Sequence, residues 1–246
     1  MISINHLMKK LDNNVILDDI TLNLDCGKYG LLGPNGAGKT TFMRCLLNIY
    51  KSPKGSILFG KESLKIGYLP QNFEAFSQMS VLDNMKYFCS VKGIKKRYWK
   101  DEINQSLKMV GMEENVSKLC RKLSGGMRRR VGIAQTLLGH PDIIILDEPT
   151  AGLDPEERKR FVSMIRSLPD EMVVLFSTHI IEDVELCCDK VIVMNNGKIC
   201  YDGSCKKIID EAQNCIEKEK YKGNYQRAVL ADGYMCVMKG LVKNEA

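Results

Sequence analysis

Eight residues from Gly33 to Thr40 have the types and spacing of a loop that wraps a phosphate chain. They read Gly-Pro-Asn-Gly-Ala-Gly-Lys-Thr and fill every fixed position of the P-loop pattern. Glycines let backbone N–H groups turn inward around an anion, and a following helix adds the positive end of its dipole. The pattern predicts that Lys39 reaches the β- and γ-phosphates of ATP and that the Thr40 hydroxyl binds Mg²⁺. The residues expected to contact the nucleotide are Asn35, Gly36, Ala37, Gly38, Lys39, Thr40 and Thr41.

An acidic pair, Asp147 and Glu148, follows the fully apolar segment 143–146. Such a segment is typical of a parallel strand covered on both faces. Carboxylates at the end of a buried strand are costly without a cationic partner, and Mg²⁺ next to Asp147 would supply one. Glu148 would then polarise the attacking water, a role that contributes roughly 10²- to 10⁴-fold in rate. A solvated acidic turn is the alternative, and the P-loop upstream makes it the weaker one.

The elements that must position these residues alternate between strand and helix. Strands are expected at 1–7, 20–24, 29–32, 56–59, 65–69, 143–146, 172–176, 190–194 and 198–201. Helices are expected at 40–49, 80–91, 99–110, 124–138, 156–168 and 180–187, with a turn at 52–55. The pattern predicts one α/β domain over 1–246: an ATPase core at about 1–71 and 140–204, a helical lobe at about 72–139, and an extension at about 205–246. A helix followed by a small β element is expected in the extension.

Composition narrows the class of protein. The 246 residues are 44% hydrophobic and 27% charged, and the net charge of +6 is too mild to predict nucleic-acid binding. No two of the ten cysteines have the spacing of paired zinc ligands, so reduced, packed thiols are expected. Residues 1–6 do not resemble a signal peptide, and no segment approaches the roughly 20 apolar residues that span a bilayer. These features predict a cytoplasmic protein.

The segment Leu123-Ser124-Gly125-Gly126-Met127 resembles the signature sequence of ATP-binding cassette (ABC) proteins, and it precedes the acidic strand as in that family. Gln71 resembles the Q-loop glutamine, 151–154 the D-loop, and His179 the switch histidine. The resemblance covers about residues 1–204. It implies a P-loop NTPase (RecA-like) core sheet with an antiparallel β subdomain and an inserted α-helical lobe.

The resemblance also implies a composite site between two cassettes that pair head to tail. Ser124, Gly125 and Gly126 of one subunit would face the P-loop of the other, and Asp154 of the D-loop would lie at the nucleotide. Since the chain carries one cassette, it would form a homodimer or pair with a relative. ATP would close the dimer and hydrolysis would reopen it.

Two polar residues take roles from the same resemblance. Gln71 would sense the γ-phosphate and bind Mg²⁺, as would Asp147 and Thr40. His179 would hold the γ-phosphate and orient the water. Together with Glu148 and Lys39, His179 completes the expected catalytic set.

Two positions depart from the family pattern. Met127 stands where many members have glutamine, and little loss of ATP binding is expected there. Leu11 occupies the position of the aromatic residue that usually stacks on adenine. A base–aromatic stack is worth roughly 1–3 kcal/mol, so weaker ATP affinity or lower base selectivity is expected.

The segments 30–35, 151–155 and 177–187 resemble the branch that serves multidrug, antibiotic-peptide and lipid export. The expected function is therefore the ATPase subunit of an exporter, attached to the inner face of the cell membrane through a separate permease. The permease would dock near Gln71 and the segment 72–119. Aromatic residues there could anchor it, although most are expected to form lobe core: Phe73, Phe76, Tyr87, Phe88, Tyr98 and Trp99.

Two other functions remain open from the sequence. A non-transport ABC ATPase acting on ribosomes or DNA would usually carry two cassettes or long coiled coils, and neither is present. A degenerate regulatory cassette is disfavoured because Lys39, Asp147, Glu148 and His179 are all there.

Overall fold

A computed structural model describes residues 2–51, 54–218 and 227–242. The chain divides into two compact units. Unit 1 comprises Met1–Glu62 and Leu175–Ala246, and unit 2 comprises Ser63–Val174. Strand β7 (Val173–Thr178) runs across the boundary between them.

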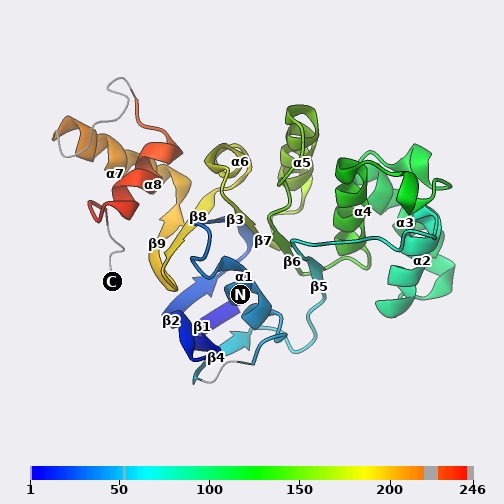
Figure 1. Cartoon of the computed structure of the whole chain (residues 1–246), viewed down its shortest axis with the longest axis horizontal. Coiled ribbons are helices and arrows are strands. Elements are labelled where there is room, and N and C mark those ends of the chain that lie inside the picture. The colour runs from blue at the N-terminus through cyan, green and yellow to red at the C-terminus, as the bar shows by residue number, and fades with distance from the viewer. Residues whose placement is uncertain (1, 52–53, 219–226, 243–246) are drawn as a thin grey trace. The chain divides into compact units, whose positions relative to one another are not determined.

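Three antiparallel strands of unit 1 lie side by side in the order β2-β1-β4 (Figure 1). They are β1 (Ile2–Leu11), β2 (Asn14–Leu24) and β4 (Lys54–Phe59). Ile4 of β1 is in register with Leu22 on one side and Ile57 on the other. Buried and less buried side chains alternate at the start of β1, from Ile2 to Ile4, and at the end of β2, from Ile20 to Leu24, which is the pattern of a sheet with one covered face.

A second sheet, separate from the β2-β1-β4 sheet, supplies the strand that leads into the P-loop. Strand β3 (Gly27–Leu32) pairs in parallel with β8 (Lys190–Asn195), which forms an antiparallel hairpin with β9 (Lys198–Ser204). Helix α1 (Lys39–Leu46) follows β3 after the glycine-rich loop. Helix α6 (Ile181–Cys187) packs on Gly30 of β3, where any Cβ would overlap the side chain of Val184.

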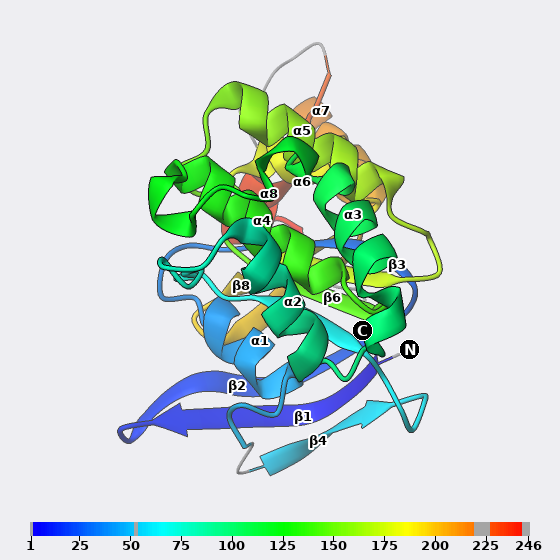
Figure 2. The same cartoon turned by 90° about the vertical axis from the view of Figure 1, so that its right-hand side faces the viewer.

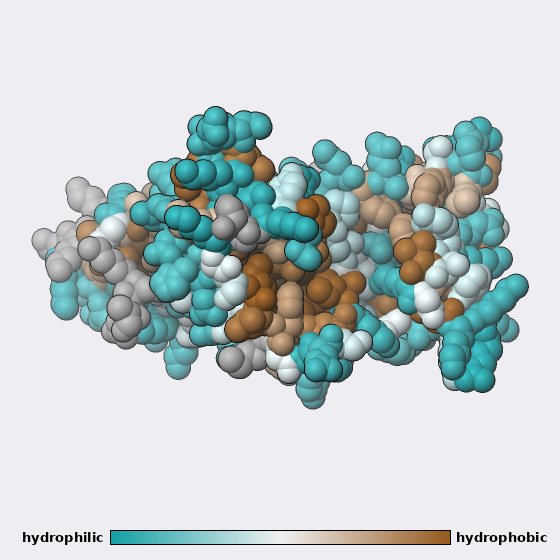
Figure 3. Space-filling model, turned by 90° about the horizontal axis from the view of Figure 1, so that it is seen from below, coloured by the Kyte–Doolittle hydropathy of each residue, from teal (hydrophilic) through white to brown (hydrophobic). Residues whose placement is uncertain are grey.

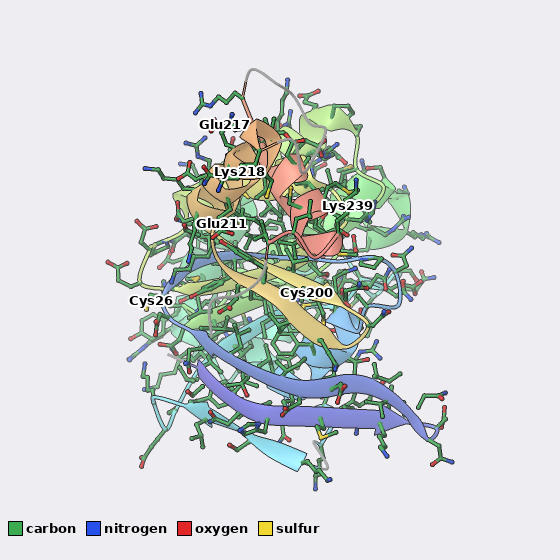
Figure 4. The ribbon with its side chains drawn as sticks, turned by 90° about the vertical axis from the view of Figure 1, so that its left-hand side faces the viewer. Cys26, Cys200, Glu211, Glu217, Lys218 and Lys239 are labelled. Carbon is green, nitrogen blue, oxygen red and sulfur yellow. The ribbon has the colours of Figure 1, made fainter. Side chains whose placement is uncertain are left out.

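The end of unit 1 is helical. Helix α7 (Cys205–Glu217) is followed by α8 (Leu230–Met238), and Glu217 and Lys239, near their ends, are labelled in Figure 4. The expected small β element is therefore wrong where the chain is described. Leu230, Gly233 and Val237 recur at helical spacing and are buried, and Gly233 lies against Ile208 of α7.

Unit 2 places two parallel strands beside a group of helices. Strands β5 (Ile66–Leu69) and β6 (Ile143–Asp147) pair in register, with Gly67 opposite Ile144. Helix α4 (Gly125–Leu137) lies beside α2 (Val81–Val91) and α3 (Trp99–Met109), as Figure 2 shows. Helix α5 (Pro155–Ser167) follows β6, and short 3₁₀ turns occupy Lys96–Tyr98, Glu113–Asn115 and Cys120–Lys122.

Lys92 closes the carboxyl end of α4. Its ammonium group donates hydrogen bonds to the carbonyl oxygens of Gln135 at 2.7 Å and of Thr136 and Leu138 at 3.1 Å. These carbonyls lack partners within the helix, and a cation there also favours the helix dipole. Burial nevertheless lowers the pKa of Lys92 to about 8.

The observed elements differ from the predicted ones mainly at their ends. Strands β1 and β2 meet in a tight turn at Asp12 and Asn13, both with positive φ, so they extend well beyond 1–7 and 20–24. Helix α1 ends at Leu46, three residues before the predicted end. The expected turn at 52–55 falls partly outside the described residues, and Lys54 already belongs to β4.

Composition led to two expectations, one about the packing of the cysteines and one about membrane-spanning segments. All ten cysteines are free, and eight are buried, the exceptions being Cys26 and Cys200. Within the described ranges, no helix is long and apolar enough to cross a membrane. Apolar surface does appear among hydrophilic residues on the face seen in Figure 3, and Leu58 and Phe59 of the edge strand β4 are exposed.

Candidate active site

The P-loop in unit 1 has the backbone that its pattern predicts. Gly38, the residue before α1, has φ +104°, a left-handed conformation that side chains rarely adopt, and Gly36 has φ +82°. The amide of Ala37 bonds the carbonyl oxygen of Pro34 at 3.2 Å and closes the turn. The loop therefore leads into the amino end of α1, where unpaired N–H groups and the helix dipole favour an anion.

Lys39 is buried and lies across its own loop. Its ammonium group donates to the carbonyl oxygens of Gly33 at 2.7 Å and Pro34 at 3.2 Å. These bonds hold the cation at the loop, where the sequence predicts contact with the β- and γ-phosphates. Thr40 and Thr41 occupy the next two positions of α1 and are half-buried.

The acidic pair ends strand β6 of unit 2. Asp147 is the last residue of the strand, and both Asp147 and Glu148 are buried. Glu148 has φ +49°, a conformation that costs a residue with a side chain of order 1–3 kcal/mol. Such strain persists only where surrounding contacts hold it, so the structure keeps the backbone of Glu148 in one conformation at the end of the strand.

A cavity of about 420 Å³ in unit 2 brings several predicted residues together. Gln71 after β5, Gly125 at the start of α4, Glu148 after β6 and Gly152 of the D-loop all line it. These residues come from four separate segments of the sequence. The Q-loop, signature and acidic-pair motifs thus meet at one place within unit 2.

The signature segment forms the start of α4. Ser124 is the N-cap residue, and its hydroxyl accepts a hydrogen bond from the amide of Met127 at 3.1 Å. The hydroxyl hydrogen can still be donated, because Ser offers one donor and two acceptor positions. Gly125 is exposed while Gly126 is buried against the Glu157 carboxylate. The predicted anion site therefore has the helix start that it requires.

Asp154 and His179 have different local roles. Asp154 is the N-cap of α5, where its carboxylate accepts from the amide of Glu157 at 2.8 Å, and Pro155 fills the first turn. His179 follows β7 in unit 1 and is exposed. The P-loop residues and His179 thus belong to unit 1, and the other predicted site residues belong to unit 2.

Arg129 is the site residue that the sequence did not reveal. The sequence shows it only as one arginine in a basic cluster, for which solvation is the usual expectation. In the structure its guanidinium is largely buried and donates to backbone carbonyls of the Q-loop and of the acidic pair. Burial lowers the pKa of Arg129, whereas the nearby Asp147 and Glu148 raise it. The available signal is helical spacing, since Arg129 comes three residues after Gly126 and four before Ile133, which are both buried in α4.

The six aromatic residues of the lobe do not form its core. Phe73, Phe88 and Trp99 are half-buried, whereas Phe76, Tyr87 and Tyr98 are exposed. The expectation that most are core is wrong, because Val81, Met85, Cys89, Ile103 and Leu107 fill the interior between α2 and α3 instead. Phe76 and Tyr87 stack edge to face with their ring centroids 4.8 Å apart.

A P-loop at a strand–helix junction and an acidic pair ending a buried parallel strand define an α/β P-loop ATPase. The ABC transporter family model matches residues 17–151, and the chain belongs to that family. It is an ATP-binding ATPase subunit of the ABC transporter type.

Relatives span both directions of transport. The chain is 36% identical over 232 residues to an uncharacterised ABC transporter ATP-binding protein, YxlF of Bacillus subtilis, covering 91% of this chain and 79% of the relative. It is 31% identical to the Nod factor export ATP-binding protein I of Cupriavidus metallidurans, covering 90% and 77%. It is 32% identical to the methionine import ATP-binding protein MetN of Protochlamydia amoebophila, covering 84% and 68%.

Solved structures share the fold. An ATP-binding subunit of an ABC transporter superposes with a TM-score of 0.80 at 21% identity, covering 96% of this chain and 99% of that one. A dimeric ATP-binding cassette bound to ADP and Pi superposes with a TM-score of 0.74 at 23% identity, covering 83% and 98%. The predicted P-loop NTPase fold is confirmed.

Proposed function

We propose that this chain powers a separate membrane permease, as an exporter, through ATP-dependent pairing of two cassettes. The observation that carries the proposal is the cavity of unit 2, where Gln71, Gly125 and Glu148 come together. These residues belong to the Q-loop, the signature segment and the acidic pair. In an ABC cassette the three motifs together would couple the presence of the γ-phosphate to the position of the helical lobe.

The nucleotide end of the proposed site belongs to the P-loop. Amides of residues 35–41 surround the phosphates, and the buried ammonium of Lys39 balances the β- and γ-phosphate charge. The Thr40 hydroxyl, the Asp147 carboxylate and the Gln71 amide are hard oxygen donors that suit Mg²⁺. When bound, Mg²⁺ neutralises charge on the β- and γ-oxygens.

The hydrolytic step is assigned to Glu148, with His179 as its helper. The Glu148 carboxylate accepts a proton from the attacking water as the bond to the γ-phosphorus forms. The bond from that phosphorus to the β,γ-bridging oxygen breaks, and the electron pair leaves with ADP. The exposed His179 side chain holds the γ-phosphate and orients the water.

A second cassette completes the site. Ser124 and Gly125 are exposed at the start of α4, next to the buried Gly126, and a helix start of this kind suits a γ-phosphate held by the partner's P-loop. Asp154, the last residue of the D-loop, caps α5 and so fixes the end of the D-loop at the start of that helix. ATP acts as a removable clamp between two copies, or between this chain and a relative.

The permease contact is assigned to the lobe near Gln71. Exposed aromatic side chains such as Phe76 and Tyr87 supply anchors of the kind that dominate interfaces. Attachment there puts the ATPase at the cytoplasmic face of the membrane. The relatives include both importers and exporters, so they do not decide the direction of transport. Export is favoured instead by the branch resemblance of residues 30–35, 151–155 and 177–187.

ATPase assays on the purified chain test this proposal. Expected are turnover in wild type, loss of ATP binding in Lys39→Ala, and retained binding with little turnover in Glu148→Gln. Co-expression with the membrane protein encoded by the neighbouring reading frame should yield a complex whose ATPase rate exceeds that of the chain alone. Stimulation by ribosomes or DNA, with none by that membrane protein, would replace transport with the ribosome- or nucleic-acid-acting alternative.

A further inference from the structure

The guanidinium of Arg129 joins three segments of unit 2. It projects from the first turns of α4, two residues after the signature motif. Its donors reach five backbone carbonyl oxygens at 2.5–3.2 Å, those of Pro70, Gln71, Asp147, Glu148 and Pro149. Arginine has five N–H donors in a fixed fork, so this set uses the full donor capacity of the side chain.

The acceptors are the backbones of the Q-loop and of the acidic pair. Two of the bonds fall on either side of Glu148, at 2.5 Å to the carbonyl of Asp147 and at 3.2 Å to that of Pro149, and a third reaches its own carbonyl at 2.7 Å. The Glu148 carbonyl also accepts the amide of Ala151 at 3.2 Å. The left-handed backbone of Glu148, with φ +49°, therefore lies within a set of bonds centred on Arg129.

The neighbouring arginines do other work. Arg128 is exposed and bonds the carbonyl of Leu123 at 2.7 Å. Arg130 bonds the carbonyl of Gly111 at 3.1 Å and pairs with Glu157 at 3.4 Å. Only Arg129 of this run is bonded to the segment that carries the proposed general base.

We propose that Arg129 is a positioning residue for hydrolysis: it holds the backbone of Glu148 in its left-handed conformation and ties it to the Q-loop. The inference rests on the proposed role of Glu148 as the base. Arg129 contacts the carboxylate-bearing segment through main-chain carbonyls, so it aims the base without touching the nucleotide. Removing it should slow the chemical step and leave the P-loop of unit 1, which binds ATP, as it is.

Substitution of Arg129 by lysine and by glutamine separates this positioning role from a purely structural one. Arg129→Gln removes the charge and the fork, whereas Arg129→Lys keeps the charge but offers three donors where five are used. Arg121→Gln is the matched control, since Arg121 is an exposed arginine of the same basic cluster. Circular dichroism and thermal unfolding establish that each full-length variant is folded.

Steady-state ATPase kinetics give the first readout. Arg129→Gln should lower kcat about tenfold or more, which corresponds to about 1.4 kcal/mol, with the KM for ATP within about twofold of wild type. Arg129→Lys should recover part of the loss, and Arg121→Gln should match wild type. A wild-type kcat in a folded Arg129→Gln variant, or a KM that rises as far as kcat falls, contradicts the proposal. If Arg129→Gln does not fold, Arg129→Lys decides by the same two criteria.

Single-turnover hydrolysis in a Glu148→Gln background gives the second readout. If Arg129 acts through Glu148, adding Arg129→Gln to Glu148→Gln should slow the reaction little further, because the group being positioned is already gone. A further loss as large as in the wild-type background contradicts the proposal. Near-normal turnover in Glu148→Gln alone would instead remove the base assignment itself, so the two failures are distinguishable.

Discussion

Gly126 of the signature helix lies so close to Glu157 of α5 that any side chain at position 126 would overlap the Glu157 carboxylate. The carboxylate is the end of a flexible side chain, but moving it away would disturb its ion pair. It pairs with Arg130 at 3.4 Å, and both side chains are about 15% exposed. The glycine therefore serves packing within unit 2 as well as the predicted approach of a phosphate.

Gly126→Ala is expected to destabilise the protein by about 1–3 kcal/mol, because the added methyl group forces the Arg130–Glu157 pair apart. Urea unfolding measures this change. Gly126→Ala combined with Glu157→Ala should be less destabilised than the sum of the two single variants, since the overlap is gone. Simple additivity in this double-mutant cycle would show that the contact is not the cause.

Leu11→Tyr is expected to raise ATP affinity. Leu11 is the half-buried last residue of β1, in the unit that holds the P-loop, and a tyrosine there would provide an aromatic face for adenine. A gain of about 1 kcal/mol, or about fivefold in Kd, follows if part of a full stack is recovered. Fluorescence titration with ATP measures it, and Leu11→Ile is the control for size. An unchanged Kd would show that position 11 does not contact the base.

Lys92 should make the free energy of unfolding rise as the pH is raised above about 8. Its pKa is about 8 in the folded protein because burial disfavours the charged form, against an ordinary value of 10.5. Between these values the unfolded chain holds more protons, so the Lys92 contribution to the free energy of unfolding rises with pH. Below about pH 8 both states are protonated and that contribution is flat.

The measurement is urea unfolding of wild type and Lys92→Met at pH 7.5 and 9.5. The stability difference between them should shift by about 2 kcal/mol in favour of wild type at the higher pH. Buried thiols such as Cys205, whose pKa burial raises to about 12, act in the opposite direction but are common to both variants. No shift in the difference would mean that Lys92 titrates normally.

Phe76→Ala and Tyr87→Ala should weaken permease binding with little effect on the ATPase rate of the chain alone. The pair is 46% and 43% exposed, and the buried side chain of Asn84 holds its loop by bonding the amide and carbonyl of Phe76. Aromatic side chains are enriched among the interface residues whose truncation costs more than about 1 kcal/mol. Pull-down with the neighbouring membrane protein measures the effect, with the exposed Val91→Ala of α2 as control. Equal binding by all three variants would place the contact elsewhere.

The sequence predicted the architecture well where local chemistry decides it. The P-loop turn requires glycine at Gly38, the helices predicted at 124–138 and 156–168 begin within one residue of the predicted positions, and the apolar run before Asp147 is a buried strand. These features depend on neighbours a few residues away. A reader of the sequence can therefore see them directly.

What the sequence did not predict depends on long-range contacts. Arg129 looks like any solvated arginine until Pro70 and Glu148, 59 and 19 residues away, supply its acceptors. Helix α8 was mistaken for a β element because its apolar residues are ambiguous alone and become a helical face only against Ile208 of α7. The lobe aromatics looked like core because their exposure is set by the packing of α2 and α3.

The central claim is that ATP completes a site shared by two cassettes. Light scattering during size-exclusion chromatography of Glu148→Gln, with and without ATP and Mg²⁺, tests it most directly. The account predicts a monomer without nucleotide, a dimer with ATP, and a monomer again when Gly125→Asp is added to block the signature face, since Gly125 is exposed and a side chain there meets nothing within the subunit. A Glu148→Gln chain that binds ATP and remains monomeric at every protein concentration, alone and with its membrane partner, would contradict it.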